Sequence, residues 1–322
     1  MVGPGLSGAV IVRIAVLCSG SVLQPVLEAL YSQGLLAGVA VPAAPAVEDP
    51  NLALETVLRQ ARVSCLRVDN GDLTGQMAPW LRSLAADALC CMGFPRKLPA
   101  DLLTMPPLGC YNFHGGPLPQ YRGPDPVFWQ IRNREVAGAI TVHRMTPRID
   151  SGAIAHEAHL PIGTDDTYGL WMQRLGGALP RVMIEFVQQL AIHGAAVPLR
   201  EQDPETGRYF PRPTDADRTI DWSWGASAID ALVRACNPVY GGALTTLHGV
   251  PVRLLEVSPL PAQAGGESTS GTVVTADAAE GLRVACGTGE LLRLELLYGM
   301  EGFFSGPRLA RIFGLKPGQR LA

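Results

Sequence analysis

The sequence predicts an α/β domain built on a parallel sheet, followed by a small domain made mostly of β-strands. In the first half, short apolar runs typical of buried strands alternate with segments of helical periodicity. In the second half, five short strand-like runs follow a single helix, which is typical of a small β-barrel. At 322 residues the chain is long enough for two domains with separate cores.

The first predicted domain spans residues 10–192. Its strands and helices are expected at 12–17, 23–33, 39–41, 52–61, 81–84, 88–92 and 139–145, in alternation along the chain. A long helix is expected from Thr164, and Pro180 should kink it or split it in two. Ligands of such sheets bind at the carboxyl ends of the strands, so the informative residues are sought there.

A change in composition separates the two predicted domains. Residues 193–208 are rich in Pro, Gly and charged residues, which predicts a linker. The second domain is then 209–322. Its predicted elements are a helix at 226–236 and strands at 243–247, 250–256, 271–275, 282–286 and 291–297.

Composition excludes several classes of protein. A net charge of −3 gives no indication of a nucleic-acid partner, and the longest apolar runs are too short to cross a bilayer, so we expect no membrane association. The first residues lack a basic flank and a cleavage site, and no signal peptide is expected. Seven cysteines, an odd number without CxxC spacing, favour free thiols in a reducing cytoplasm.

The densest group of chemically informative residues lies at 109–123. If 110–114 is a strand, Asn112 and His114 project from the same face, which places an amide beside an imidazole. Asp150 lies in a Gly-containing loop after the strand expected at 139–145, from where its carboxylate could reach His114.

Acyl transfer to an amine needs the three functions that these side chains offer. The oxyanion of the tetrahedral intermediate needs a donor, for which we assign Asn112 and a protonated His114. The proton lost by the amine needs an acceptor, and Asp150 would orient His114 and relay that proton. Taken singly, each residue has a structural interpretation, because Asn and Asp are common turn formers and a lone His is more often structural than catalytic.

The order of these motifs resembles the 10-formyltetrahydrofolate-dependent formyltransferases, among them the methionyl-tRNA and amine or sugar N-formyltransferases. The matching segments are Asn-x-His at 112–114, Gly-Pro-Leu-Pro at 116–119, Arg-Gly at 122–123 and Asp-x-Gly at 150–152. The likeness continues through 218–223 and 233–238 to 314–318. It implies a Rossmann-like catalytic domain, a C-terminal OB-like barrel, and a catalytic triad at Asn112, His114 and Asp150.

The resemblance also implies the binding residues. 10-Formyltetrahydrofolate would be the formyl donor, with no metal, and its expected contacts are Met92, Phe94, Ile149 and Asp150. The amine would be bound near Gly116, Pro117, Tyr121 and Arg122. Gly116 and Pro117 stand where the commonest family pattern has Ser and Leu, a difference that leaves the triad intact and bears on the shape of the acceptor pocket.

The acceptor is expected to be a small-molecule amine, such as an amino sugar nucleotide or a natural-product amine, rather than tRNA. The tRNA-specific members of the resembling family have a basic loop after the second strand. The corresponding stretch 42–56 contains Glu48, Asp49 and Glu55 and no Lys or Arg. Methionyl-tRNA stays an alternative acceptor. The oligomeric state is open, with a homodimer among the alternatives.

The sequence has three other interpretations. His143, His156 and His159 could be offered as a metal site, but no Cys or carboxylate joins them at ligand spacing. A formyltetrahydrofolate hydrolase would use the same triad to deliver water. A non-catalytic folate-binding module would result if the Gly-Gly-Pro segment had spoiled the acceptor pocket.

Overall fold

The computed structural model describes residues 11–20, 23–44, 49–262 and 268–321. These residues form two compact units. The first comprises the chain up to Gly123, Gly138–Leu160 and Arg174–Tyr209, and the second comprises the three remaining stretches, Pro124–Ala137, Pro161–Gln173 and the chain from Phe210. The residues predicted as a linker, 193–208, therefore belong to the first unit. The expected start of the first domain, at residue 10, lies outside the described residues.

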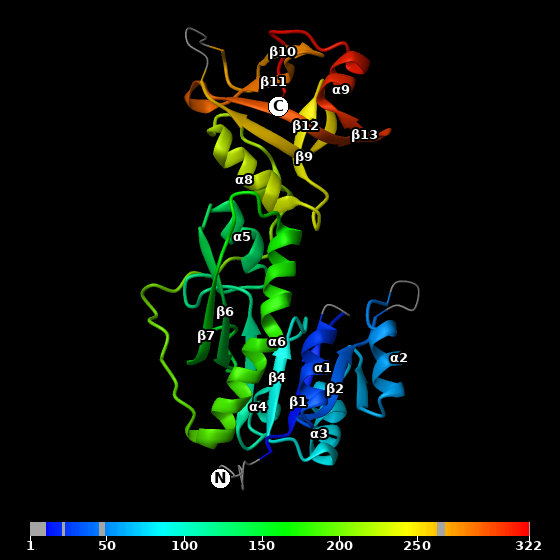
Figure 1. Cartoon of the computed structure of the whole chain (residues 1–322), viewed down its shortest axis with the longest axis vertical. Coiled ribbons are helices and arrows are strands. Elements are labelled where there is room, and N and C mark those ends of the chain that lie inside the picture. Colours follow the sequence, from blue (N-terminus) through cyan, green and yellow to red (C-terminus); the bar gives the residue numbers. More distant parts are fainter. Residues whose placement is uncertain (1–10, 21–22, 45–48, 263–267, 322) are drawn as a thin grey trace, which may run out of the picture. The chain divides into compact units, whose positions relative to one another are not determined.

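A seven-stranded sheet forms the centre of the first unit within the described residues (Figure 1). Its strand order is β3-β2-β1-β4-β5-β6-β7. The strands are β1 (Ile14–Cys18), β2 (Leu36–Pro42), β3 (Ser64–Val68), β4 (Ala88–Met92), β5 (Gly109–His114), β6 (Ala137–Arg144) and β7 (Ile154–Pro161). The first five pair in parallel, as predicted, whereas β6 runs antiparallel to β5. The edge strands β3 and β7 were not predicted.

Helices cover both faces of this sheet. They are α1 (Gln24–Ser32), α2 (Leu52–Gln60), α3 (Leu73–Leu84), α4 (Ala100–Leu103) and α6 (Tyr168–His193). On one face, Leu17 and Leu89 share a buried cluster with side chains of α3 and α4, such as Leu81. On the other, Tyr111 packs its ring edgewise against Phe186 of α6, with centroids 4.7 Å apart. The alternation of inward-facing residues along each strand places both sets in the core.

Helix α6 corrects one expectation. It begins at Tyr168 rather than Thr164 and is continuous to His193, with Pro180 inside it. Of the two outcomes predicted for Pro180, the split into two helices is therefore wrong, and the kink stays a prediction. Proline in a helix interior costs about 3 kcal/mol, but Trp171, Val182 and Phe186 of this helix are fully buried. Burying large side chains of this kind contributes about 1.5–3 kcal/mol each, which outweighs the local cost.

The second unit contains an antiparallel sheet of six strands within the described residues. The path β10-β11-β12-β9-β8 carries β13 on β12. Its elements are α5 (Pro126–Arg132), α7 (Asp215–Arg218), α8 (Ala226–Cys236), β8 (Ala243–Leu247), β9 (Val250–Leu260), β10 (Val273–Asp277), β11 (Gly281–Ala285), β12 (Leu291–Gly299), β13 (Gly302–Ser305) and α9 (Gly306–Phe313). The predicted helix 226–236 and strand 243–247 match α8 and β8. The predicted fold class, a parallel-sheet domain followed by a smaller β domain, is confirmed.

Two further findings concern the described residues as a whole. None of their helices is long and apolar enough to span a membrane. All seven cysteines are free, and all but Cys65 are buried.

Gly177 offers a test of whether α6 is a regular helix at this exposed turn. A Cβ built at this exposed helical position meets no heavy atom within 4 Å. Alanine has the higher helix propensity, so Gly177→Ala should stabilise the protein by about 0.5–1 kcal/mol. The melting temperature, measured by circular dichroism, should rise by about 1–3 °C. A fall in melting temperature would show that this turn of the helix is not regular in solution.

Candidate active site

Strand β5 delivers the first two predicted catalytic residues to one face of the sheet. Tyr111 and Phe113 both contact Phe186 on the α6 side. Since side chains alternate along a strand, Asn112 and His114 project from the opposite face. They lie at the carboxyl end of β5, where ligands of parallel sheets bind.

The tautomer of His114 follows from its contacts. His114 is buried, with 6% of its surface exposed, and its Nε2 lies 2.6 Å from the carbonyl oxygen of Tyr121. A carbonyl only accepts hydrogen bonds, so Nε2 carries the proton and donates it. In the neutral ring, Nδ1 then holds a lone pair. That atom lies 3.8 Å from Oδ2 of Asp150.

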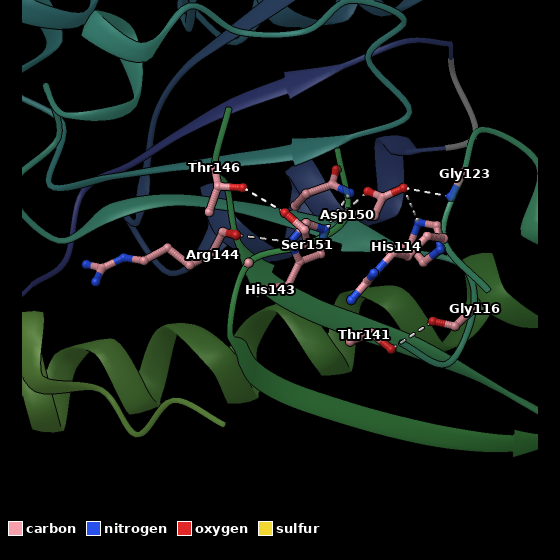
Figure 2. Close-up of polar contacts among 12 residues, drawn as sticks. His114, Gly116, Gly123, Thr141, His143, Arg144, Thr146, Asp150 and Ser151 are labelled. Carbon is pink, nitrogen blue, oxygen red and sulfur yellow. Dashed lines mark hydrogen bonds and ion pairs between the residues drawn. The ribbon is translucent and has the colours of Figure 1, made fainter. Parts of the chain in front are cut away.

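Asp150 lies in the loop between β6 and β7 and is held in a strained conformation. Its φ of 50° is in the left-handed region, which non-glycine residues rarely adopt. Its carboxylate is buried and accepts a hydrogen bond from the backbone N–H of Gly123 at 2.9 Å (Figure 2). Strain of this kind costs about 1–3 kcal/mol and persists only where the surroundings impose it, which is common at functional sites.

Burial and charge act in opposite directions on Asp150. Burial raises the pKa of its carboxyl group, but the neighbouring His143 and His114 and the Gly123 N–H lower it, and the net pKa lies below the usual value of 3.8. Asp150 is therefore ionised at neutral pH.

His114 responds differently to the same surroundings. Burial lowers the pKa of His114 below its usual 6.5, and the opposing effects of Asp150 and the Tyr121 carbonyl do not overcome this. The ring is therefore neutral at pH 7. The expectation of a His114 that is already protonated is not supported for the site as described. The physical reason is that the Asp150 carboxylate, 3.8 Å away, does not compensate for desolvation of the imidazolium.

The structure adds His143, which sequence reasoning considered only as a metal ligand. Its Nε2 lies 3.4 Å from Oδ1 of Asp150 and 3.2 Å from Nδ2 of Asn112. Its Nδ1 lies 3.1 Å from the Arg144 carbonyl oxygen and donates to it. In the β5–β6 register Asn112 stands directly opposite His143. The antiparallel pairing of β6 with β5 therefore places His143 next to the predicted triad. The sequence predicts a parallel sheet, and this expectation did not indicate that His143 would lie there.

The three histidines weighed as a metal site are dispersed. His156 pairs with Glu185 and His159 with Glu157, whereas His143 faces Asp150. Among the residues that the structure describes, no group of three or more His, Cys, Asp or Glu is arranged to hold a metal ion.

The predicted folate contacts differ in how far they are exposed to solvent. Met92 is buried at the end of β4, and Phe94 is partly buried against the core beside α3 and α4. Ile149 is 51% exposed, directly before the buried Asp150. Their role in folate binding stays a prediction.

The predicted acceptor contacts form the segment that supports His114. Thr141 donates a hydrogen bond to the Gly116 carbonyl at 2.8 Å (Figure 2), and the Tyr121 N–H donates to the Pro117 carbonyl at 3.0 Å. The Arg122 guanidinium is bound to Gln202. These contacts fix the segment, and its binding of an acceptor stays a prediction.

A cavity of about 470 Å³ lies in the first unit, at the amino end of β5. It is lined by Ala100, Leu103, Thr104, Pro106, Pro107, Gly109, Cys110, Arg144, Met145, Thr146 and Pro147. Cys110 is two residues before Asn112 on β5, so the strand alternation places it on the catalytic face. Thr146 and Pro147 begin the loop that leads to Asp150. The cavity is mostly apolar, with Arg144 as its charged residue.

Two family models match the chain. The model described as formyl transferase covers residues 12–187, and the model described as formyl transferase, C-terminal domain, covers residues 213–302. The chain therefore belongs to the formyl transferase family. The predictions of the family, and of an enzyme that performs folate-dependent formyl transfer, are confirmed.

Particular relatives are similar over most of the chain. The methionyl-tRNA formyltransferase of Anaeromyxobacter dehalogenans is 33% identical over 286 residues, which cover 87% of this chain and 90% of that protein. A Helicobacter canadensis N-formyltransferase, solved with folinic acid and dTDP-3-aminofucose, gives a TM-score of 0.65 at 14% identity and covers 88% of this chain and 98% of its own. Glycinamide ribonucleotide transformylase 1 of Symbiobacterium toebii gives 0.51 at 26% identity and covers 60% and 95%.

Gly152 tests the shape of the Asp150 loop. A Cβ at Gly152 would lie 1.8 Å from the Arg144 carbonyl oxygen, a backbone atom that cannot move away easily. Gly152→Ala should lower the free energy of unfolding by about 1–3 kcal/mol and displace Asp150. Chemical denaturation measures the first effect and formyl transfer the second. Unchanged stability together with full activity would mean that the loop has a different conformation.

The His114 pKa predicts how stability depends on pH. Its folded-state pKa is below the ordinary value of 6.5, so the unfolded chain binds the proton more readily. The stabilisation is present above pH 6.5 and is lost as the pH falls through the folded-state pKa. Urea denaturation between pH 7.5 and 5 should show a falling free energy of unfolding, with a smaller slope in His114→Gln. The exposed His193→Gln variant controls for removing an imidazole. Equal slopes in wild type and His114→Gln would contradict the assignment.

Proposed function

We propose that this enzyme transfers the formyl group of 10-formyltetrahydrofolate to an amine, with Asn112, His114 and Asp150 as catalytic residues. The observation that carries the proposal is the geometry of His114: its Nε2 donates to the Tyr121 carbonyl, which leaves Nδ1 free to accept a proton 3.8 Å from the Asp150 carboxylate. This pair can take up a proton without a change in the surrounding fold.

The reaction divides among the three side chains. The amine nitrogen attacks the formyl carbon, and the carbonyl electrons move to oxygen. Asn112 directs one amide hydrogen to His143 and has a second with no partner among the described residues, which can donate to the oxyanion. The proton lost by the amine passes to Nδ1 of His114, directly or through water. Collapse of the intermediate breaks the bond between carbon and N10 of the folate, and that nitrogen receives the proton.

Asp150 acts by stabilising the charge that forms on His114. A neutral imidazole becomes an imidazolium only when the amine loses its proton, which is the stage at which the oxyanion is present. A fixed carboxylate 3.8 Å away favours that charged form. This role replaces the expected resting imidazolium, and it requires neither a metal ion nor a covalent intermediate.

The folate would bind on the catalytic face of the sheet, where Met92, Phe94, Ile149 and Asp150 are its proposed contacts. The cavity of about 470 Å³ at the amino end of β5 has an apolar lining with a few polar groups and a volume in the range of ligand pockets. Its lining includes neither the triad nor these proposed folate contacts, so the cavity is not assigned to the folate.

For the acceptor, we favour a small-molecule amine. The stretch 42–56 has no Lys or Arg, and Gly116 and Pro117 depart from the commonest family pattern next to the triad. Neutralising tRNA phosphates requires clustered basic residues, which this stretch does not provide.

Methionyl-tRNA is the second candidate, favoured by the relatives that are about 30–33% identical and bear that name. Ion pairs also reduce the negative charge of the stretch 42–56. Arg67 of β3 pairs with both Asp49 and Glu55, so part of the acidic charge is neutralised locally. Glu48 lies outside the described residues.

Release of tetrahydrofolate from 10-formyltetrahydrofolate, followed optically, tests the proposal. The panel of acceptors includes amino sugar nucleotides, ornithine, N-hydroxyornithine and methionyl-tRNA. We expect acceptor-dependent release that falls by about 10²–10⁴-fold in His114→Ala and in Asp150→Asn. The exposed His159→Ala variant should retain the wild-type rate.

The outcomes separate the open alternatives. Release with methionyl-tRNA alone would contradict the small-molecule acceptor. Release of formate without any amine would indicate a hydrolase with the same triad. Folate binding without release in any mixture would contradict formyl transfer and leave the binding module.

A further inference from the structure

Gln202 is a buried polar residue in the stretch that the sequence predicts to be a linker. It is 9% exposed and belongs to the first compact unit. The surrounding segment contacts the unit at two further points. The backbone of Arg200 pairs with Ile154 at the start of β7, and the backbone of Arg208 bonds to Pro119 and Arg122. The segment around Gln202 is therefore fixed against the start of β7 and the turn that follows β5.

Every hydrogen-bonding group of the Gln202 amide is used. Its Nε2 donates to the carbonyl oxygens of Asp150 at 3.0 Å and of Gly152 at 2.7 Å. Its Oε1 accepts from Nε of Arg122 at 3.0 Å and from Nη2 of Arg122 at 2.7 Å. A guanidinium only donates and a carbonyl only accepts, so this orientation of the amide is the only one that satisfies all four contacts.

These contacts hold the strained part of the Asp150 loop. Two carbonyls on either side of Ser151 are joined to one nitrogen, which fixes the path of residues 150–152. A positive φ at Asp150 costs free energy and needs such support. Without it, the loop could relax toward a conformation that directs the carboxylate elsewhere.

The Arg122–Gly123 dipeptide is linked to both the backbone carbonyl and the side-chain carboxylate of Asp150. Its guanidinium orients Gln202, which binds the Asp150 carbonyl, and the next residue, Gly123, donates its N–H to the Asp150 carboxylate. The guanidinium also fills the space beside Gly207, where a Cβ would lie 2.5 Å from Nη1 of Arg122. The backbone and the side chain of Asp150 are thus both held from the Arg122–Gly123 dipeptide.

We propose that Gln202 is a positioning residue for formyl transfer, acting through the backbone of Asp150 and oriented by Arg122. The proposal rests on the proposed function, because it assigns Asp150 the catalytic carboxylate. Gln202 itself does not touch the reacting atoms.

Gln202→Glu is the sharpest test. A carboxylate still accepts from Arg122, but it cannot donate to the Asp150 and Gly152 carbonyls and instead repels them. We expect kcat to fall by about 10²-fold, the size of effect that a misplaced catalytic group produces. The KM values for the folate and the amine should stay within about twofold. Gln202→Ala, which removes the clamp without adding charge, should fall in the same direction.

Arg200→Ala is the matched control in the same segment. Its side chain is 60% exposed and pairs with Glu157 rather than with the Asp150 loop. It should leave kcat unchanged. A kcat within twofold of wild type in Gln202→Glu, or a loss confined to KM, would overturn the proposal.

Amide hydrogen exchange gives a readout that does not depend on activity. In both Gln202 variants, peptides covering residues 146–153 should exchange about tenfold faster or more, while peptides of β1 and β4 stay as in the wild type. Unchanged exchange at 146–153, or uniformly faster exchange with a general fall in melting temperature, would overturn the positioning role. A wild-type protein inactive on every acceptor would defeat the proposed function, and the exchange measurement would still decide whether Gln202 holds the loop.

Discussion

The site depends on the burial of one ionised carboxylate, that of Asp150. The free energy lost when a carboxylate leaves water must be offset by nearby hydrogen bonds and charges. Burial alone would raise its pKa toward protonation. The Gly123 N–H donates a hydrogen bond to the carboxylate, and the net pKa of Asp150 lies below its usual value. With the negative charge fixed there, a neutral His114 next to it can accept a proton at low cost. The chemistry therefore depends on how well Asp150 is compensated.

Compensation of Asp150 draws on segments that are far apart in the chain. β5 supplies Asn112 and His114, the turn after it supplies Gly123, β6 supplies His143, and the segment after α6 supplies Gln202. All of them belong to the first compact unit. The groups assigned to the chemistry therefore all come from one unit.

Sequence reasoning found the strands that are buried in the sheet and missed those at its edges. β1 and β4 are fully buried and read as apolar runs. β3 and β7 are the two edge strands, and their mixture of exposed and buried residues gives no comparable run. The motif residues on β5 could be predicted because they are close in sequence. His143 and Gln202 could not, because the antiparallel direction of β6 and the return of residues 200–209 are long-range features.

The charge of the stretch 42–56 also depends on a residue outside it. The stretch 42–56 looks acidic in sequence, yet Arg67, outside that window, pairs with both Asp49 and Glu55. Surface ion pairs contribute little to stability, but they do cancel charge as seen by a polyanion at a distance. The electrostatic character of a loop is therefore set by the strands beside it as much as by its own residues. For this reason the folded site indicates the reaction more directly than it indicates the acceptor.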